Sequence, residues 1–418
     1  MDHETEHTIE VIRASVRNST PGRLIDLQRE SLRDESTPNH VHVAKKELSL
    51  STDTNLVELV ADAIRSLGDG HETFTVPTVA SVVVESVEHE AKENKCSGGS
   101  DIEPRPIILY FHGGQFWRMG RALRWVTGEL ARQTKGRCVA VRYSLAPQHP
   151  FPTALVEGLA AYVSLLYPTE GNLHTSVAAR NICFAGDSAG GNIALALLQL
   201  ILEINRKGQK LFWNGRESEI PVPAGTAVLS PYVDMVRSLD SEVLNLPYDI
   251  IGPRGPLFTV FDRCDIWPAK PPRHHVYADD SALLHPLVSP VTVRNWKGAP
   301  PLWVCVGEEC LADQGMFVAQ QAASTGATAV VEQFSMMPHN FSLIVPHAVP
   351  SKLSLQQWAS FIRSVVEKPS SIKSEAMRWS GVPPLKTSMD LSRLVPLQRE
   401  GVIEKMKAQI QDWGVPPS

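Results

Sequence analysis

A serine held between two glycines constrains this chain more than any other feature, in the run Gly186-Asp-Ser188-Ala-Gly190. The apolar run 181–185 before it predicts a buried strand, and the run 193–202 after it predicts a helix. A sharp strand–turn–helix junction strains its central residue, and flanking glycines let strand and helix come close together. Such a junction directs the Ser188 hydroxyl out of the sheet. It also puts the Ala189 N–H at a helix N-terminus, where it can stabilise an oxyanion.

The glycine–serine motif alone does not establish a catalytic serine, because a bare G-x-S-x-G arises by chance in roughly one chain in ten of this length. A second motif is needed. It lies upstream, where the apolar strand candidate 107–111 runs into His112-Gly-Gly-Gln-Phe116. A His-Gly-Gly turn at a strand end is typical of a loop that offers backbone N–H groups to a developing negative charge. The alternative for each motif is an ordinary glycine-rich turn between a strand and a helix.

Composition bounds the class of protein. The 418 residues are 43% hydrophobic and 20% charged, which fits one large α/β domain with additions. A net charge of −5 gives no sign of a nucleic-acid partner or an anionic membrane. The first forty residues carry no apolar signal segment, and no apolar run is long enough to span a membrane, so we expect a cytoplasmic location.

The six cysteines show neither a C-x-x-C pair nor a zinc-ligand spacing, so we predict no metal site. Cys138, Cys183 and Cys305 lie in apolar strand candidates. We expect them to be buried free thiols in a reducing compartment.

Apolar strands alternate with helices along most of the chain. Strands are expected at 79–87, 107–111, 137–143, 181–185, 226–230, 302–306 and 328–334, and helices at 56–67, 154–166, 193–202 and 396–413. This alternation predicts a mostly parallel sheet covered by helices on both faces. We divide the chain into an N-terminal cap or extension (1–70), a core (71–366) with a cap insertion at 236–276, and a C-terminal tail (367–418).

Two further motifs complete a family pattern. The segment Tyr143–Pro152 looks like YRLAPEHPFP, with Ser144 and Gln148 in place of Arg and Glu, and His285–Pro290 resembles the segment that commonly precedes a catalytic acid. With the two glycine motifs in the same order, residues 105–345 resemble the hormone-sensitive-lipase-like branch of the α/β-hydrolases. The resemblance implies an α/β-hydrolase fold with a helical cap, and catalysis without a cofactor.

The resemblance also implies a catalytic triad in the chain order Ser, acid, His. Ser188 is the nucleophile. Aligning 307–313 with the pattern G-x-x-D-x-L-x-D puts Glu309 at the acid position, with Glu308 and Asp313 as rivals. His339, which follows the strand 328–334, is the predicted base. The other candidates, His112, His149, His285 and His347, fit this position less well.

The oxyanion hole and the substrate pocket follow from the same resemblance. We expect N–H groups from Gly113, Gly114, Gln115 and Ala189 to form the hole, and Gln115 to line the acyl side. We place Phe116 and Asp187 at the substrate pocket. The 236–276 insertion is expected to lie above Ser188, where Phe258, Phe261 and Trp267 would supply an apolar wall unless they pack on the core.

The predicted function is a serine carboxylic-ester hydrolase. The long N-terminal region and the insertion resemble steryl acetyl hydrolases and esterases of fungal secondary metabolism. This favours removal of a short acyl group from a bulky apolar alcohol such as a sterol or natural product. Two alternatives stay open: a cyclase or acyltransferase using the same triad, and a non-catalytic small-molecule receptor on the same fold. The expected partner is a small-molecule ester, and the sequence predicts no oligomeric state.

Overall fold

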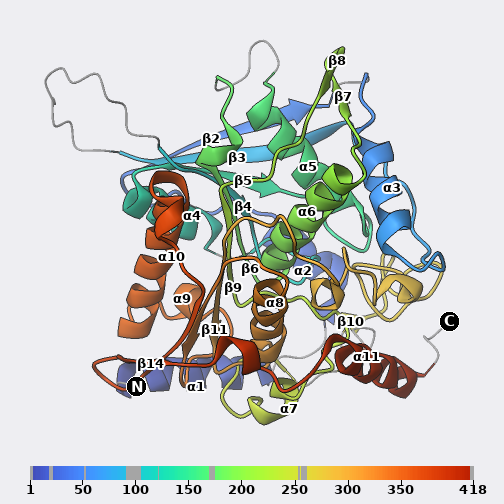
Figure 1. Ribbon diagram of the computed structural model, residues 1–418. Coiled ribbons are helices and arrows are strands. Elements are labelled where there is room, and N and C mark those ends of the chain that lie inside the picture. The colour runs from blue at the N-terminus through green and yellow to red at the C-terminus, as the bar shows by residue number, and fades with distance from the viewer. Residues whose placement is uncertain are drawn as a thin grey trace, which may run out of the picture.

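Ten strands form one central sheet in the computed structural model (Figure 1), which describes residues 3–17, 22–50, 53–90, 105–120, 122–168, 175–252, 255 and 261–414. The strands lie in the order β14-β13-β12-β11-β9-β6-β4-β5-β3-β2. Those from β5 to β13 run parallel to their neighbours, whereas β2, β3 and β14 pair antiparallel at the two edges. The bounds of the sheet strands are Val41–Ser49 (β2), Ser81–His89 (β3), Ile107–Phe111 (β4), Arg137–Arg142 (β5), Ile182–Asp187 (β6), Gly225–Leu229 (β9), Leu302–Gly307 (β11), Ala329–Phe334 (β12), Glu375–Ser380 (β13) and Leu385–Ser388 (β14).

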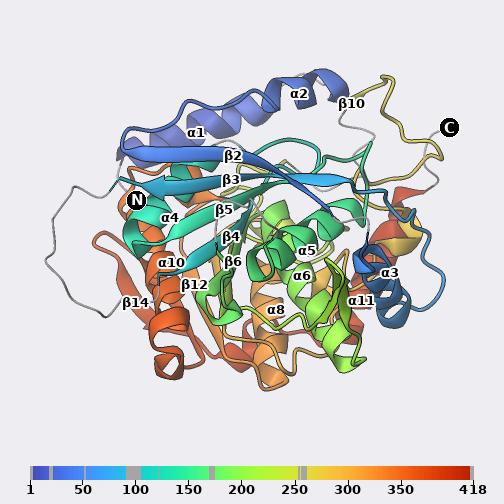
Figure 2. The ribbon, with the colours of Figure 1, turned by 90° about the horizontal axis from the view of Figure 1, so that it is seen from above.

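Helices cover both faces of this sheet, as Figure 2 shows: α4 and α10 lie on one side, and α5, α6 and α8 on the other. The longer helices are His3–Arg17 (α1), Leu24–Ser31 (α2), Leu56–Leu67 (α3), Leu123–Thr134 (α4), Thr153–Leu166 (α5), Ala189–Arg206 (α6), Ala312–Ser324 (α8), Val349–Glu367 (α10) and Arg399–Trp413 (α11). Two helices of four residues, Ser241–Leu244 (α7) and Phe341–Ile344 (α9), lie in loops.

Two hydrophobic cores result from this layering, one on each face. Along β4 the side chains alternate between them: Leu109 and Phe111 join the core under α5 and α6, and Ile108 and Tyr110 join the core under α4 and α10. All five β4 residues are buried, because both faces are covered. A strand buried on both faces favours apolar residues at nearly every position, which is why most of these strands are near-continuous apolar runs in the sequence.

The predicted α/β-hydrolase architecture is confirmed. Each predicted strand and helix is present. The bounds of 107–111 and 56–67 match, the others shift by a few residues, and α6 extends beyond the predicted 193–202 at both ends. Cys138, Cys183 and Cys305 are buried free thiols, as expected. Among the described residues, no helix combines the length and the apolar character that crossing a membrane requires.

The two terminal regions contribute strands that the sequence analysis did not predict. Within 1–70, β2 forms one edge of the central sheet, and within 367–418, β13 and β14 form the other edge. Strand β1 (Gly22–Arg23) pairs in parallel with β10 (Phe261–Asp262) of the 236–276 insertion. The N-terminal region and the insertion therefore lie side by side. A small separate hairpin joins β7 (Leu211–Trp213) to β8 (Arg216–Ser218).

Candidate active site

The serine at the strand–helix junction has a strained backbone. Ser188 ends the run of β6 and caps α6 with φ 52° and ψ −119°, a conformation that L-residues rarely adopt. The flanking positions must be glycine because there is no room for a Cβ atom at either of them. A Cβ on Gly186 would lie 2.5 Å from the backbone of Gly190, and a Cβ on Gly190 would lie 1.9 Å from the Phe111 carbonyl oxygen. These contacts let α6 pack directly against β4 and present the serine hydroxyl beyond the strand.

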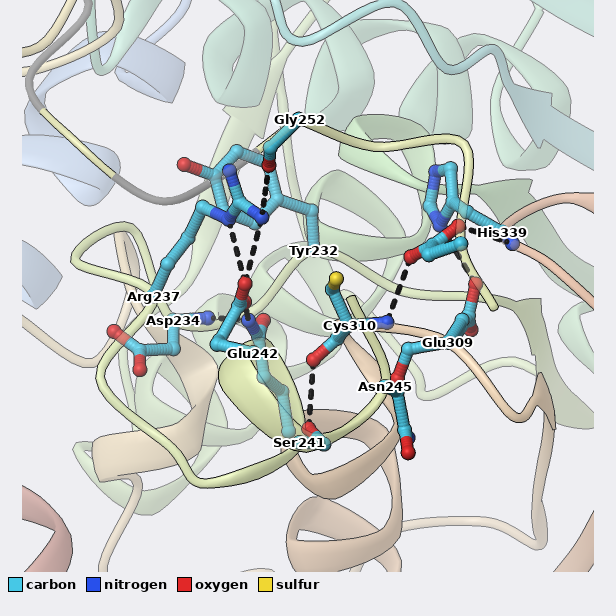
Figure 3. Close-up of polar contacts among 12 residues, drawn as sticks. Tyr232, Asp234, Arg237, Ser241, Glu242, Asn245, Gly252, Glu309, Cys310 and His339 are labelled. Carbon is cyan, nitrogen blue, oxygen red and sulfur yellow. Dashed lines mark hydrogen bonds and ion pairs between the residues drawn. The ribbon is translucent and has the colours of Figure 1, made fainter. Parts of the chain in front are cut away.

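A continuous hydrogen-bonded chain joins this hydroxyl to a buried carboxyl. His339 follows β12 and Glu309 follows β11, so both reach the same edge of the sheet as Ser188. The His339 Nε2 atom lies 3.0 Å from Ser188 Oγ, and its Nδ1 atom lies 2.8 Å from Glu309 Oε2. Glu309 is fully buried beside His339 (Figure 3). The three residues aligned from the sequence are thus brought together.

Burial and charge act in opposite directions on this pair. Burial lowers the pKa of His339, but the nearby carboxylates, chiefly the hydrogen-bonded Glu309, together more than offset this, so the pKa of His339 is raised. Burial also raises the pKa of Glu309, and the facing His339 works against that change. The surroundings of His339 therefore stabilise the protonated form of its imidazole ring.

The rival acids and histidines make other contacts. A Glu308 carboxylate oxygen accepts the Met336 N–H at 2.8 Å, and one from Asp313 accepts the Ser241 N–H at 2.9 Å. The His285 ring is buried with Nε2 3.0 Å from the Ile64 carbonyl oxygen. Neither carboxyl nor that ring reaches Ser188.

The ring of His112 packs against the glycine loop and helps to fix its position. It stacks on Tyr143 with ring centroids 4.2 Å apart, and its Nδ1 lies 2.7 Å from the Gly113 carbonyl oxygen. Burial lowers the pKa of His112 to about 4, so the ring is neutral at pH 7. A neutral, stacked imidazole fixes the loop rather than exchanging protons with a substrate.

The glycine loop presents backbone N–H groups near Ser188. Gly114 has a φ of +112°, and a Cβ there would lie 2.2 Å from the Arg118 carbonyl oxygen; Gln115 follows with a φ of 54°. Within the described residues, no protein acceptor takes the N–H of Gly114, Gln115 or Ala189. Gln115 lines the cavity at Ser188, and its Oε1 accepts the Trp117 Nε1–H at 3.0 Å.

Gly113 differs from its predicted role. Its N–H donates to Asp187 Oδ1 at 2.9 Å and is therefore not free for an oxyanion. Asp187 Oδ1 also accepts the Tyr110 hydroxyl at 2.7 Å, and its Oδ2 accepts Asn340 Nδ2 at 2.9 Å. Asp187 thus links β4, the glycine loop and the loop that carries Asn340, instead of lining the substrate pocket as predicted. Burial raises the pKa of this carboxyl, while its three donors oppose the rise.

A cavity opens beside Ser188 and His339, both of which line it. Its apolar wall among the described residues consists of Met235, Val236, Ile251, Leu311 and Trp413, and its polar members are Gln115, Tyr232, Arg237, His274 and His275. Arg237 is balanced by Glu242, whose Oε2 lies 2.6 Å from its Nη2 (Figure 3), and His275 Nε2 lies 3.2 Å from the Tyr232 hydroxyl. The cavity is therefore apolar with internally paired polar groups.

The predicted aromatic wall is wrong in the residues that the structure describes. Phe116 stacks on Tyr277 with centroids 3.8 Å apart, and Trp267 is fully buried. Phe261 packs edge-on against Trp117. None of them lines the cavity, because their rings are used by the core, as the alternative interpretation held. Phe258 lies outside the described residues.

Sequence reasoning missed one residue that lines the cavity and one that supports the loop carrying His339. Trp413 comes from α11, at the end of the predicted tail, and its ring lies 5.4 Å from that of His274. Asp249, in the insertion, accepts the backbone N–H of His339 at 2.9 Å. Both belong to segments without a recognisable motif, so no local signal identified them. No cluster of three or more metal-ligating side chains occurs in the part of the chain that the structure describes.

Known proteins resemble this chain in sequence and in fold. A family model described as alpha/beta hydrolase fold matches residues 108–343. The chain is 25% identical over 260 residues to an acetyl-hydrolase of Streptomyces hygroscopicus and 26% identical over 261 residues to an esterase of Acinetobacter venetianus, covering 62% of this chain and 75% of each relative. A solved hormone-sensitive lipase from a metagenome library superposes with a TM-score of 0.62 at 21% identity, covering 88% of this chain and 99% of that one.

Proposed function

Because the chain belongs to the alpha/beta hydrolase fold family and is a carboxylic-ester hydrolase, we propose that Ser188, His339 and Glu309 are its catalytic triad. One observation carries the proposal: the unbroken sequence of contacts from the Glu309 carboxylate through both ring nitrogens of His339 to the Ser188 hydroxyl, at 2.8 Å and 3.0 Å. This is the geometry that a nucleophile, a general base and an orienting acid require.

The reaction follows from these positions. Ser188 Oγ attacks the ester carbonyl carbon while its proton passes to His339 Nε2, and Glu309 stabilises the resulting imidazolium. The tetrahedral intermediate collapses when His339 returns the proton to the leaving alcohol, which breaks the carbon–oxygen bond of the ester. A water molecule then gives its proton to His339 and attacks the acyl-serine, releasing the acid and restoring Ser188.

The proposed oxyanion hole consists of the N–H groups of Gly114, Gln115 and Ala189. All three lack a protein acceptor among the described residues, and Ala189 begins α6, where the helix dipole favours negative charge. Each donor is worth about 3 kcal/mol of transition-state stabilisation. Gly113 is left out because Asp187 takes its N–H.

We further propose that the substrate is a short-chain ester of a bulky apolar alcohol, such as a sterol or another natural product. The cavity opens directly beside Ser188 and His339, and its apolar wall suits an apolar alcohol. The charge of Arg237 in that wall is neutralised by Glu242, which favours an uncharged substrate. The acetyl-hydrolase relative supports a small acyl group.

Two measurements test this function. The Ser188→Ala variant should lose kcat/KM by about a thousandfold or more on p-nitrophenyl acetate while its melting temperature stays near that of the native enzyme. A fluorophosphonate probe should label the native enzyme and not the variant. A variant that keeps more than about a tenth of the native kcat/KM contradicts the assignment of Ser188. A kcat/KM maximum at long acyl chains, in a series from acetate to laurate, contradicts the short-acyl proposal.

A further inference from the structure

We propose that Asp249 is a positioning residue that fixes Glu309 and His339, the acid and the base of the triad, relative to each other. This inference rests on the function proposed above. Asp249 belongs to the 236–276 insertion and is 1% exposed. It touches neither Ser188 nor the cavity, and it acts through the backbone of the two loops that carry Glu309 and His339.

The acid loop is held by one short segment of the insertion, 241–249. The Ser241 hydroxyl donates to the Cys310 carbonyl oxygen at 2.6 Å (Figure 3), and Asn245 Nδ2 donates to the Glu309 carbonyl oxygen at 2.9 Å. Asp249 Oδ2 accepts the Cys310 N–H at 2.7 Å. The two peptide groups that flank Cys310, the residue after Glu309, are thus fixed from outside their own loop.

The base loop is held by the other oxygen of the same carboxyl group. Asp249 Oδ1 accepts the His339 N–H at 2.9 Å and the Ile250 N–H at 2.7 Å. One side chain therefore links the loop after β11 to the loop after β12. Hydrogen bonds to an ionised acceptor are roughly twice as strong as those between neutral groups, and a displacement of about 1 Å at a catalytic group can cost about a hundredfold in rate.

The charge of Asp249 also acts on the pair that it positions. Three carboxyl groups face His339: Glu309 from the loop after β11, Asp249 from the insertion and Asp187 from the end of β6. Each of them raises the pKa of His339. The Asp249 charge also raises the pKa of Glu309. Removing that charge should therefore lower the pKa of the base even where the contact between Glu309 and His339 is kept.

The segment is in turn fixed by the N-terminal region. Arg13 of α1 donates from Nε to the Asp249 carbonyl oxygen at 3.1 Å and from Nη2 to the Tyr248 carbonyl oxygen at 2.7 Å. The carboxyl group of Asp249 points inward to the triad loops while its backbone is tied outward to α1. The insertion therefore has a supporting role in addition to its contribution to the cavity wall.

The Asp249→Asn variant of the full-length enzyme tests the proposal. It keeps the side-chain shape, but only one of its two terminal atoms can still accept a hydrogen bond from a backbone N–H. We expect kcat on p-nitrophenyl acetate to fall about 10- to 100-fold with KM little changed, measured per active site titrated with a fluorophosphonate. The acidic limb of the kcat/KM profile should move to lower pH. The matched control is Asp240→Asn in the same insertion, whose side chain pairs with Lys405 at the surface and which should match the native enzyme.

A second variant keeps the test decisive if Asp249→Asn fails to fold. Asn245→Ala removes one neutral contact to the same loop, and we expect a several-fold loss of kcat without a shift of the pH limb. The proposal is overturned if every folded variant stays within twofold of the native enzyme, or if Asp249→Asn loses activity with its pH limb unmoved. Absence of Ser188-dependent esterase activity in the native enzyme would instead refute the proposed function, so the two failures are distinguishable.

Discussion

Replacing Glu309 by glutamine removes the charge opposite His339 and leaves the size of the side chain unchanged. The two groups are buried, and Oε2 lies 2.8 Å from Nδ1. Charges about 4 Å apart interact by about 4 kcal/mol at an effective dielectric constant of about 20, which corresponds to roughly a thousandfold in rate. The amide can also impose the wrong imidazole tautomer, so we expect kcat to fall by about 10³ to 10⁴.

The assay is steady-state hydrolysis of p-nitrophenyl acetate from pH 5 to pH 9. Glu309 raises the pKa of His339, so its neutralisation should shift the acidic limb of kcat/KM toward lower pH while the plateau falls. Glu308→Gln is the matched control, since the same chemical change occurs one residue away on a side chain that contacts Met336. A larger loss in Glu308→Gln or in Asp313→Asn would refute our assignment of the acid.

Two further predictions concern packing and specificity. Gly190→Ala should lower the melting temperature by at least about 5 °C, because the added Cβ would lie 1.9 Å from the Phe111 carbonyl oxygen. Gly401→Ala, in α11, is the control: its Cβ would have its nearest contact at 3.6 Å, so the melting temperature should stay unchanged or rise slightly. Equal melting temperatures of the two variants would contradict this prediction. Trp413→Ala should reduce kcat/KM for steryl acetates more than for p-nitrophenyl acetate, with Trp413→Phe largely retaining both, and equal losses would show that the ring only supports the fold.

The sequence predicted those parts of the molecule whose geometry is local. The Ser188 turn needs two glycines at fixed spacing because its close contacts arise within one strand–helix junction. The strand ends that carry Glu309 and His339 are visible because a continuous apolar run precedes Glu309 and a largely apolar one precedes His339. For the same reason the buried parallel strands were found, whereas β13 and β14 were not. These edge strands mix charged and apolar residues and are partly exposed.

The walls of the site could not be predicted because they depend on contacts between distant segments. Trp267 and Phe261 are large and apolar, but pattern alone does not tell whether such a ring faces a cavity or the core. Trp413 reaches the cavity only because α11 packs back across the molecule, and Asp249 meets His339 across 90 positions of sequence. The Gly113 N–H was assigned to the oxyanion hole because its acceptor, Asp187, lies 74 positions away.

The network around Asp187 has a consequence for the order of folding. Its carboxyl group joins the end of β4, the glycine loop and Asn340, which lie 77, 74 and 153 residues away in the chain. Contacts at such separations form late, because each closes a long loop at an entropic cost before it stabilises the fold. During refolding from denaturant, helix content should therefore recover before hydrolytic activity does. The time between the two signals would measure how long the molecule exists as an ordered but inactive intermediate.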